Sequence, residues 1–135
     1  MTQPPTPHRP LSPHLQIWRW HVTMLSSILN RITGVMSLAG LIILAGFVTC
    51  LAMGPQAYTV FLTYAANPWA LIIWFGLTLA GFLHIGAGIR HLIWDLGLGF
   101  KLKDADALSL WSMILPILAA IAVFAYLYMS GKIVL

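Results

Sequence analysis

Charge is what this sequence lacks. Only 7% of its 135 residues are charged, whereas 60% are hydrophobic, and its mean hydropathy is +0.89. A soluble domain needs roughly a quarter of its residues charged to stay dispersed. No Asp, Glu, Lys or Arg occurs between Arg31 and Arg90. Because a helix crosses a bilayer with about 20 apolar residues, this gap accommodates two crossings and excludes a soluble protein.

Other absences exclude further classes of protein. The seven Lys and Arg residues form no dense basic patch, which argues against nucleic-acid binding, and they bracket the apolar runs as topology determinants do. Cys50 is the one cysteine, has no zinc or c-type haem spacing around it, and is interpreted as a small core residue. No internal repeat with broken helices is present, which counts against a secondary transporter.

The N-terminus lacks the features of a targeting peptide. Its first dozen residues, MTQPPTPHRPLS, are polar and proline-rich, without an apolar run before a small-residue cleavage site and without the Arg- and Ser-rich composition of a transit peptide. We therefore expect the chain to begin as written and to lie in a bacterial inner membrane as a multi-pass protein.

The apolar runs predict an all-α integral membrane protein with three transmembrane helices. Residues 1–24 are expected to form a proline-rich tail and an interfacial segment, and residues 25–135 a three-helix membrane domain. The breaks at Gly54-Pro55, Gly97 and Gly99 place the spans at about 25–53, 68–96 and 108–130. The connections are expected to be a loop or surface-lying stretch up to Asn67 and a polar loop at 101–106, and Pro116 is a candidate kink in the third span.

The distribution of cations predicts the orientation. With three spans, the N-terminal tail shares a side with the loop near residue 100, and that side carries Arg9, Arg19, Arg31, Arg90, Lys101 and Lys103. The other side has Lys132. The N-terminus is therefore predicted to be cytoplasmic and the C-terminus periplasmic.

The second span carries a stripe that we interpret as an inward-facing haem site. Gly81, His84, Gly88, His91 and Asp95 are spaced three, four, three and four, which places them on one helical face. His84 lies about 10 Å deeper than His91, where a histidine is by default a functional candidate. The glycines would let a flat macrocycle approach the backbone while the imidazole reaches its iron. Glycines also serve helix packing, and a buried histidine can bond across helices, so the pattern alone leaves both interpretations open.

A haem with two histidine ligands needs a partner chain. His91 lies on the same side of the same helix as His84, so the two cannot face one another across one iron. His8, His14 and His21 precede the first span and are expected to be too shallow. The opposite ligand is therefore expected from another subunit.

A second cluster lies on the first span at Ser27, Asn30, Arg31 and Gly34. Ser27 and Arg31, one turn apart, could donate hydrogen bonds to a quinone carbonyl, an acceptor that becomes negative on reduction. Arginines near a membrane surface also snorkel without any ligand, and the spacing alone favours that simpler explanation.

Three segments resemble the cytochrome b membrane-anchor subunit of succinate dehydrogenase, the larger anchor of respiratory complex II. They are RPLSPHLQIWRW, SSILNRITG and HIGAGIRHLIWDLG, carrying the motifs SPH, S-I-L-x-R-x-[ST]-G and H-x-x-x-G-I-R-H-x-x-x-D in order. The resemblance covers nearly the whole chain from Arg9 onward.

The resemblance implies a complex that oxidises succinate and reduces ubiquinone, made of a flavoprotein, an iron-sulfur protein and two small anchors bundled in the membrane. It implies that His84 is an axial ligand of haem b, that the second anchor supplies the other ligand, and that Ser27 and Arg31 bind the quinone. Arg31, with Asn30, would lie near the haem propionates, and Gly81 and Gly88 would pack on the haem. His91 and Asp95 would form the polar, quinone-side end of the stripe.

One position departs from the family pattern. The family commonly has histidine where this chain has Asn30, which can donate a hydrogen bond but cannot carry a proton charge.

Two other functions remain open. They are a haem-free anchor scaffold and the anchor of a quinol:fumarate reductase. A proton channel is disfavoured, because one deep histidine without intramembrane acids is a poor relay.

Overall fold

The computed structural model describes residues 19–133, which form four helices and no strand. These are α1 (Val22–Ala52), α2 (Pro55–Ala65), α3 (Pro68–Asp95) and α4 (Leu102–Met129). Three of them, α1, α3 and α4, are long and apolar enough to cross a membrane, with mean hydropathies of 2.4, 1.9 and 2.3. The predicted set of three spans is confirmed, and the chain is a multi-pass membrane protein.

The structure defines the first predicted connection and corrects the second. The segment after Gly54, predicted as a loop or a surface-lying stretch, forms the short helix α2, with Pro55 in the first turn, where proline suits a helix start. The polar loop expected at 101–106 is largely the first turn of α4, which begins at Leu102. Asp104 in that turn is stabilised by the positive end of the helix dipole, so polarity there marks a helix start.

The first span begins a few residues earlier than predicted. α1 begins at Val22, inside the segment 1–24 assigned to the tail and interface, and its N-cap is His21. The predictions for residues 1–18, including His8, Arg9 and His14, lie outside the described residues.

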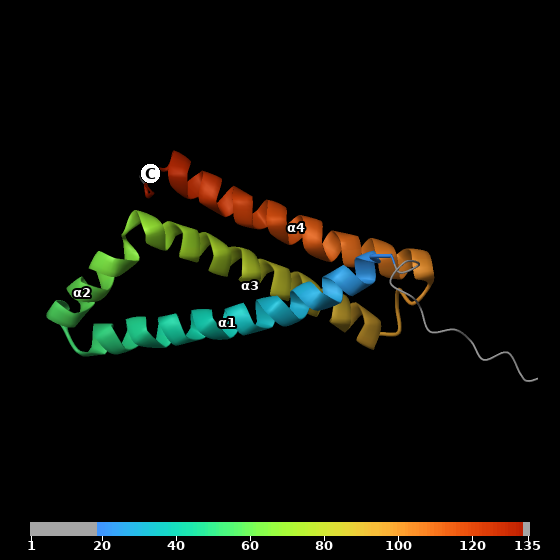
Figure 1. The fold of residues 1–135 in the computed structure, drawn as a ribbon, viewed down its shortest axis with the longest axis horizontal. Helices are drawn as coiled ribbons and strands as arrows, with labels where there is room; N and C mark the ends of the chain where they lie inside the picture. Colours follow the sequence, from blue (N-terminus) through green and yellow to red (C-terminus); the bar gives the residue numbers. More distant parts are fainter. Residues whose placement is uncertain (1–18, 134–135) are drawn as a thin grey trace, which may run out of the picture.

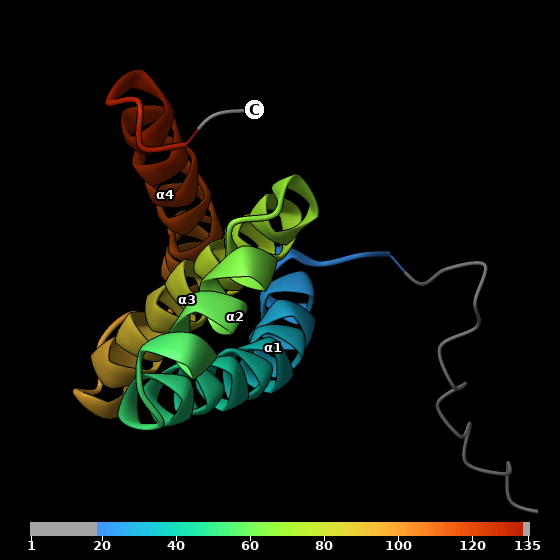
Figure 2. The same ribbon diagram turned by 90° about the vertical axis from the view of Figure 1, so that its left-hand side faces the viewer.

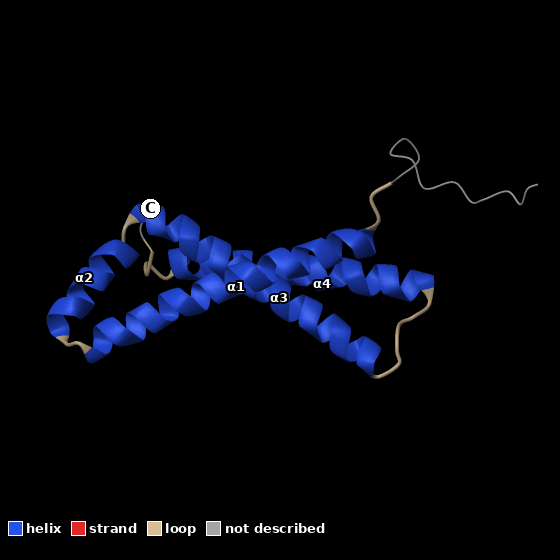
Figure 3. Cartoon of the chain, turned by 60° about the horizontal axis from the view of Figure 1, so that its bottom comes forward, coloured by secondary structure: helices blue, strands red, loops and turns tan. Residues whose placement is uncertain are grey.

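The three long helices pack around α3. It contacts both α1 and α4 along much of its length, while α2 connects the far ends of α1 and α3 (Figure 1). α1 and α3 run antiparallel and cross one another (Figure 3). α4 leans away from the other long helices toward its C-terminal end (Figure 2). α4 therefore lies closer to α3 near its N-terminal half than near its C-terminal end.

α3 approaches α4 closely where a glycine lies opposite a proline. A Cβ placed on Gly86 would lie 2.6 Å from Pro116 Cγ and 2.6 Å from the carbonyl oxygen of Ser112. In a regular helix the Ser112 carbonyl would accept a hydrogen bond from the backbone N–H of residue 116. Because Pro116 has no N–H, that hydrogen bond is missing. The bare backbone of Gly86 lets this turn of α4 press against α3 and sets the spacing of the two helices.

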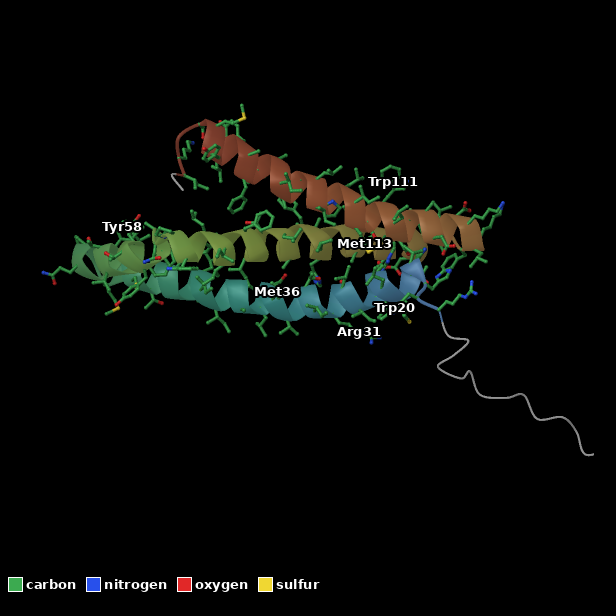
Figure 4. All side chains as sticks on the ribbon, turned by 45° about the horizontal axis from the view of Figure 1, so that its top comes forward. Trp20, Arg31, Met36, Tyr58, Trp111 and Met113 are labelled. Atoms are coloured by element: carbon green, nitrogen blue, oxygen red, sulfur yellow. The ribbon has the colours of Figure 1, made fainter. Side chains whose placement is uncertain are left out.

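The buried residues are small or polar. The buried apolar residues are Ala80, Ala87, Met113, Pro116 and Ala120, and the buried polar or charged ones are Ser26, Thr33, Arg90 and Ser109. Most large apolar side chains point outward, as Figure 4 shows along the length of the helices. This composition is typical of membrane bundles, where small residues allow close packing and hydroxyls hydrogen-bond between helices.

Candidate functional site

One buried cation joins the three long helices at the end where α1 and α4 begin. Arg90 on α3 is 2% exposed, and its Nη1 donates hydrogen bonds to Ser26 Oγ on α1 and to Ser109 Oγ on α4, the latter at 3.2 Å. Its guanidinium also lies 4.8 Å from the centre of the Trp94 ring, within range of a cation–π contact. Sequence reasoning counted Arg90 only as a topology charge and missed this link.

His84 lies against α1 at the edge of the α1–α3 interface. A Cβ placed on Gly34 would be 3.4 Å from His84 Cε1 and 3.8 Å from its Nδ1. The imidazole is therefore backed by the α1 backbone, while the His84 side chain as a whole is exposed. Gly34 was expected to be part of the first-span cluster, and the structure brings it to the histidine of the second-span stripe.

The stripe predicted to face inward instead lies on an outer face of this chain. His84, Gly88, His91 and Asp95 are exposed, and Gly81 is half-buried. The reason is that α3 buries the adjacent face, which carries Ala80, Ala87 and Arg90, against α1 and α4. Periodicity groups the five residues correctly, but it does not determine which face of the helix a neighbour covers.

The two glycines of the stripe leave open space. A Cβ on Gly81 or on Gly88 would meet nothing within 4 Å. They lie roughly one turn to either side of His84, so the backbone of α3 is accessible above and below the imidazole. An empty strip of this kind can receive a flat group or the surface of another helix.

Ser27 and Arg31 of the first-span cluster lie on the same side of α1 as Gly34, which contacts His84. Arg31 is exposed and points away from α4 (Figure 4), whereas Ser27 and Asn30 are half-buried. Among the described residues, neither the Ser27 hydroxyl nor the Arg31 guanidinium makes a hydrogen bond or ion pair. The Ser27 hydroxyl and the Arg31 guanidinium, one turn apart, are thus two unpaired donors among the described residues. They lie on the side of the α1–α3 interface, here called the α1–α3 seam, that α4 does not cover.

The contacts Ser26–Arg90 and Gly34–His84 give the relative depth of these residues. Because α1 and α3 are antiparallel, Arg31 lies at a level between Arg90 and His84. The His84 imidazole and the two donors of α1 therefore share one face, with the donors nearer the end at which α1 begins.

The remaining polar residues lie at that same end. His91 and Asp95 are exposed near the C-terminus of α3, and the His91 ring packs edge-on to Trp94 with centroids 5.3 Å apart. His21 Nε2 lies 3.5 Å from Asp106 Oδ1 at the start of α4. His21 is therefore held toward α4 rather than toward His84.

Comparison with known proteins decides the family. A family model described as "Succinate dehydrogenase/Fumarate reductase transmembrane subunit" matches residues 5–125. The chain belongs to this family. Among its relatives, the succinate dehydrogenase cytochrome b556 subunit of Paracoccus denitrificans is 32% identical over 88% of this chain and 95% of the relative.

Two further succinate dehydrogenase relatives are a second bacterial subunit and a mitochondrial one. The cytochrome b556 subunit of Rickettsia felis is 36% identical over 73% of this chain and 76% of the relative. The mitochondrial cytochrome b560 subunit of Sus scrofa is 35% identical over 87% of this chain and 71% of the relative. The resemblance to the cytochrome b membrane-anchor subunit of succinate dehydrogenase is therefore confirmed.

Proposed function

We propose that this chain anchors a succinate dehydrogenase in the membrane, binds haem b through His84, and forms part of the ubiquinone-reduction site with Ser27 and Arg31. The observation that carries the proposal is the exposed imidazole of His84, backed by Gly34 and flanked by the open glycines Gly81 and Gly88. The cytochrome b names of the relatives support it.

The residues around His84 fit a haem. Imidazole nitrogen is a common axial ligand of haem iron, and Cε1 and Nδ1 are the atoms of this ring that lie within 4 Å of a Cβ on Gly34, so Nε2 lies further from α1. The bare backbone at Gly81 and Gly88 would accept the macrocycle on either side of the ring. Asn30 and Arg31 are the candidates to hydrogen-bond the propionates. Bound haem b supplies a one-electron carrier at this level of the membrane.

Among the described residues no second histidine is placed to share an iron with His84, so we propose that the other ligand comes from another chain. His91 is on the same face of α3 as His84 but about 10 Å along the helix, and His21 is held toward Asp106. Neither can reach the opposite face of an iron bound to His84. A second membrane-anchor subunit seated on the exposed side of the α1–α3 seam would supply the ligand and cover the stripe.

The quinone would bind between Ser27 and Arg31. The hydroxyl and the guanidinium can both donate hydrogen bonds to one carbonyl oxygen, and the fixed positive charge stabilises that oxygen as negative charge develops on it during reduction. In an apolar surrounding this stabilisation is larger than in water. His91 and Asp95 would form the polar, water-accessible end of the same face, from which protons can arrive.

The distribution of charge gives the orientation that we propose. The end at which α1 begins carries Arg19, Arg31, Arg90, Lys101 and Lys103, whereas Lys132 lies at the other. That end is therefore proposed as cytoplasmic, with the C-terminus periplasmic. The iron-sulfur and flavoprotein subunits would dock there and deliver electrons from succinate to the quinone. The bacterial relatives support an inner-membrane location.

The direction of the reaction is proposed as succinate oxidation. The relatives named above are all succinate dehydrogenase subunits, which favours this direction over a quinol:fumarate reductase. The haem-free scaffold, in contrast, is tested by spectroscopy.

A reduced-minus-oxidised spectrum of the purified complex tests the haem proposal. We expect a haem b signal in the wild type, its loss in His84→Ala, and its retention in His91→Ala, a matched change on the same face of α3. An assembled wild-type complex without the signal, or an unchanged signal in His84→Ala, would contradict the assignment.

A further inference from the structure

Arg90 is buried without an acidic partner in the part of the chain that the structure describes. The carboxylate of Asp106 lies against His21, whereas the Arg90 guanidinium meets two hydroxyls and the face of Trp94. A buried charge is costly unless it is paired and hydrogen-bonded. Arg31, on the neighbouring helix, is exposed, so the bundle can place a cation outward at this end. The inward placement of Arg90 therefore calls for an explanation from its contacts.

Those contacts link α1 to the other two helices through one nitrogen. Arg90 Nη1 donates to Ser26 on α1 and to Ser109 on α4, while Arg90 Nε is buried with no partner in the described part of the chain. The two hydroxyls therefore fix the position of the guanidinium. α3 and α4 are also held together by the close contact at Gly86. Among residues 19–133, the hydrogen bond from Arg90 Nη1 to Ser26 Oγ is the one side-chain hydrogen bond that joins α1 to α3.

The contact with Ser26 determines which face of α1 is buried at this end. Ser26 and Thr33, two turns apart on one face, are 2% and 3% exposed. Ser27 follows Ser26 directly and lies about 100° further round the helix. Burying Ser26 therefore turns Ser27 and Arg31 to the side of the seam away from α4, where the quinone is proposed to bind.

We propose that Arg90 is a positioning residue for quinone reduction: by holding Ser26, it fixes the rotation of α1 and so directs Ser27 and Arg31 toward the quinone. This inference rests on the proposed quinone site. Arg90 itself does not touch the quinone. It acts from the buried side of α1, opposite the two donors.

Two alanine variants separate this role from a general contribution to packing. Ser26→Ala and Ser109→Ala each remove one hydroxyl from the same Arg90 nitrogen, but only the first releases α1. A hydrogen bond to a charged group contributes on the order of one tenfold step in an equilibrium constant. In the four-subunit complex we expect Ser26→Ala to raise the KM for a short-chain ubiquinone about three- to tenfold. Ser109→Ala should stay within about twofold of the wild type.

The readouts must distinguish misplacement of the donors from loss of assembly. Succinate oxidation by a soluble dye and the haem b signal per flavin should be unchanged in both serine variants, and the effect of Ser26→Ala should fall on KM more than on kcat. Arg90→Gln removes the cation altogether and can prevent assembly, so the serine pair carries the test. An equal rise in KM in both serine variants, or none in either, would overturn the positioning role.

Arg31→Leu, measured in parallel, separates this inference from the function on which it rests. If Arg31→Leu impairs quinone reduction while Ser26→Ala behaves as the wild type, Arg90 is not a positioning residue but the quinone site stands. If Arg31→Leu reduces quinone normally, the quinone site itself is wrongly assigned, and the role of Arg90 is overturned with it.

Discussion

The imidazole of His84 on α3 rests against Gly34 of α1, with its Cε1 3.4 Å from where a Cβ on that glycine would lie. This contact joins the two motifs that the sequence keeps 50 positions apart. It gives Gly34 a specific role, because a side chain at this position would decide where the histidine ring can sit. The proposed haem ligand therefore lies directly against one member of the first-span cluster.

Substitution of Gly34 should alter the haem in proportion to the size of the new side chain. Gly34→Ala brings a methyl group into ordinary van der Waals contact and should leave the haem b spectrum nearly unchanged. Gly34→Val adds two further methyl groups and should displace the ring, at a cost of about 1–3 kcal/mol for overpacking. Redox titration should then show a shifted haem b potential or a lower haem content per flavin. Equal spectra and potentials for both variants would contradict the role given to Gly34.

The open space at Gly88 predicts a loss of haem without a loss of folding. Nothing among residues 19–133 lies within 4 Å of a Cβ at Gly88, so Gly88→Leu should not disturb the packing of α1, α3 and α4. The side chain would occupy the strip beside His84 proposed for the macrocycle. We expect the haem content per flavin to fall severalfold.

Gly46→Leu is the matched control for that measurement. Gly46 on α1 is also exposed with nothing within 4 Å, but it lies three turns beyond Gly34, away from the stripe. The control should retain haem. Full haem content in the Gly88→Leu complex would argue that the strip receives a helix surface instead.

Gly86 should be intolerant of any side chain, for a reason unrelated to haem. A Cβ there would lie 2.6 Å from the backbone oxygen of Ser112, and backbone cannot move aside as a flexible side chain can. Gly86→Ala should separate α3 from α4 and destabilise the complex by about 1–3 kcal/mol. Thermal melting of the purified complex measures this, with Gly46→Ala as the control that adds a methyl group in open space. An unchanged melting temperature for Gly86→Ala would show that α4 adjusts freely.

The sequence predicts the long apolar helices better than it predicts which of their faces are covered. A charge-free run and glycine breaks are local signals, so three helices and the stripe of His84 could be recognised. The start of α4 could not, because Asp104 reads as loop polarity unless its place at a helix N-terminus is known. The outward direction of the stripe and the burial of Arg90 depend on which faces α1 and α4 cover, and helical periodicity does not contain that information.

Arg31 provides the sharpest test of the quinone site. Its guanidinium is exposed and makes no hydrogen bond or ion pair with the described residues, so its removal should break no such interaction among residues 19–133. If Arg31 stabilises the reduced quinone oxygen, Arg31→Leu loses a charge-assisted hydrogen bond of about 1.5–3 kcal/mol. That corresponds to a fall of roughly tenfold or more in kcat/KM for ubiquinone. Succinate oxidation by a soluble dye bypasses the quinone and should be unchanged, and Arg19→Leu, an exposed arginine just before α1, is the matched control. Normal ubiquinone reduction by Arg31→Leu would show that this arginine only anchors α1 at the membrane surface.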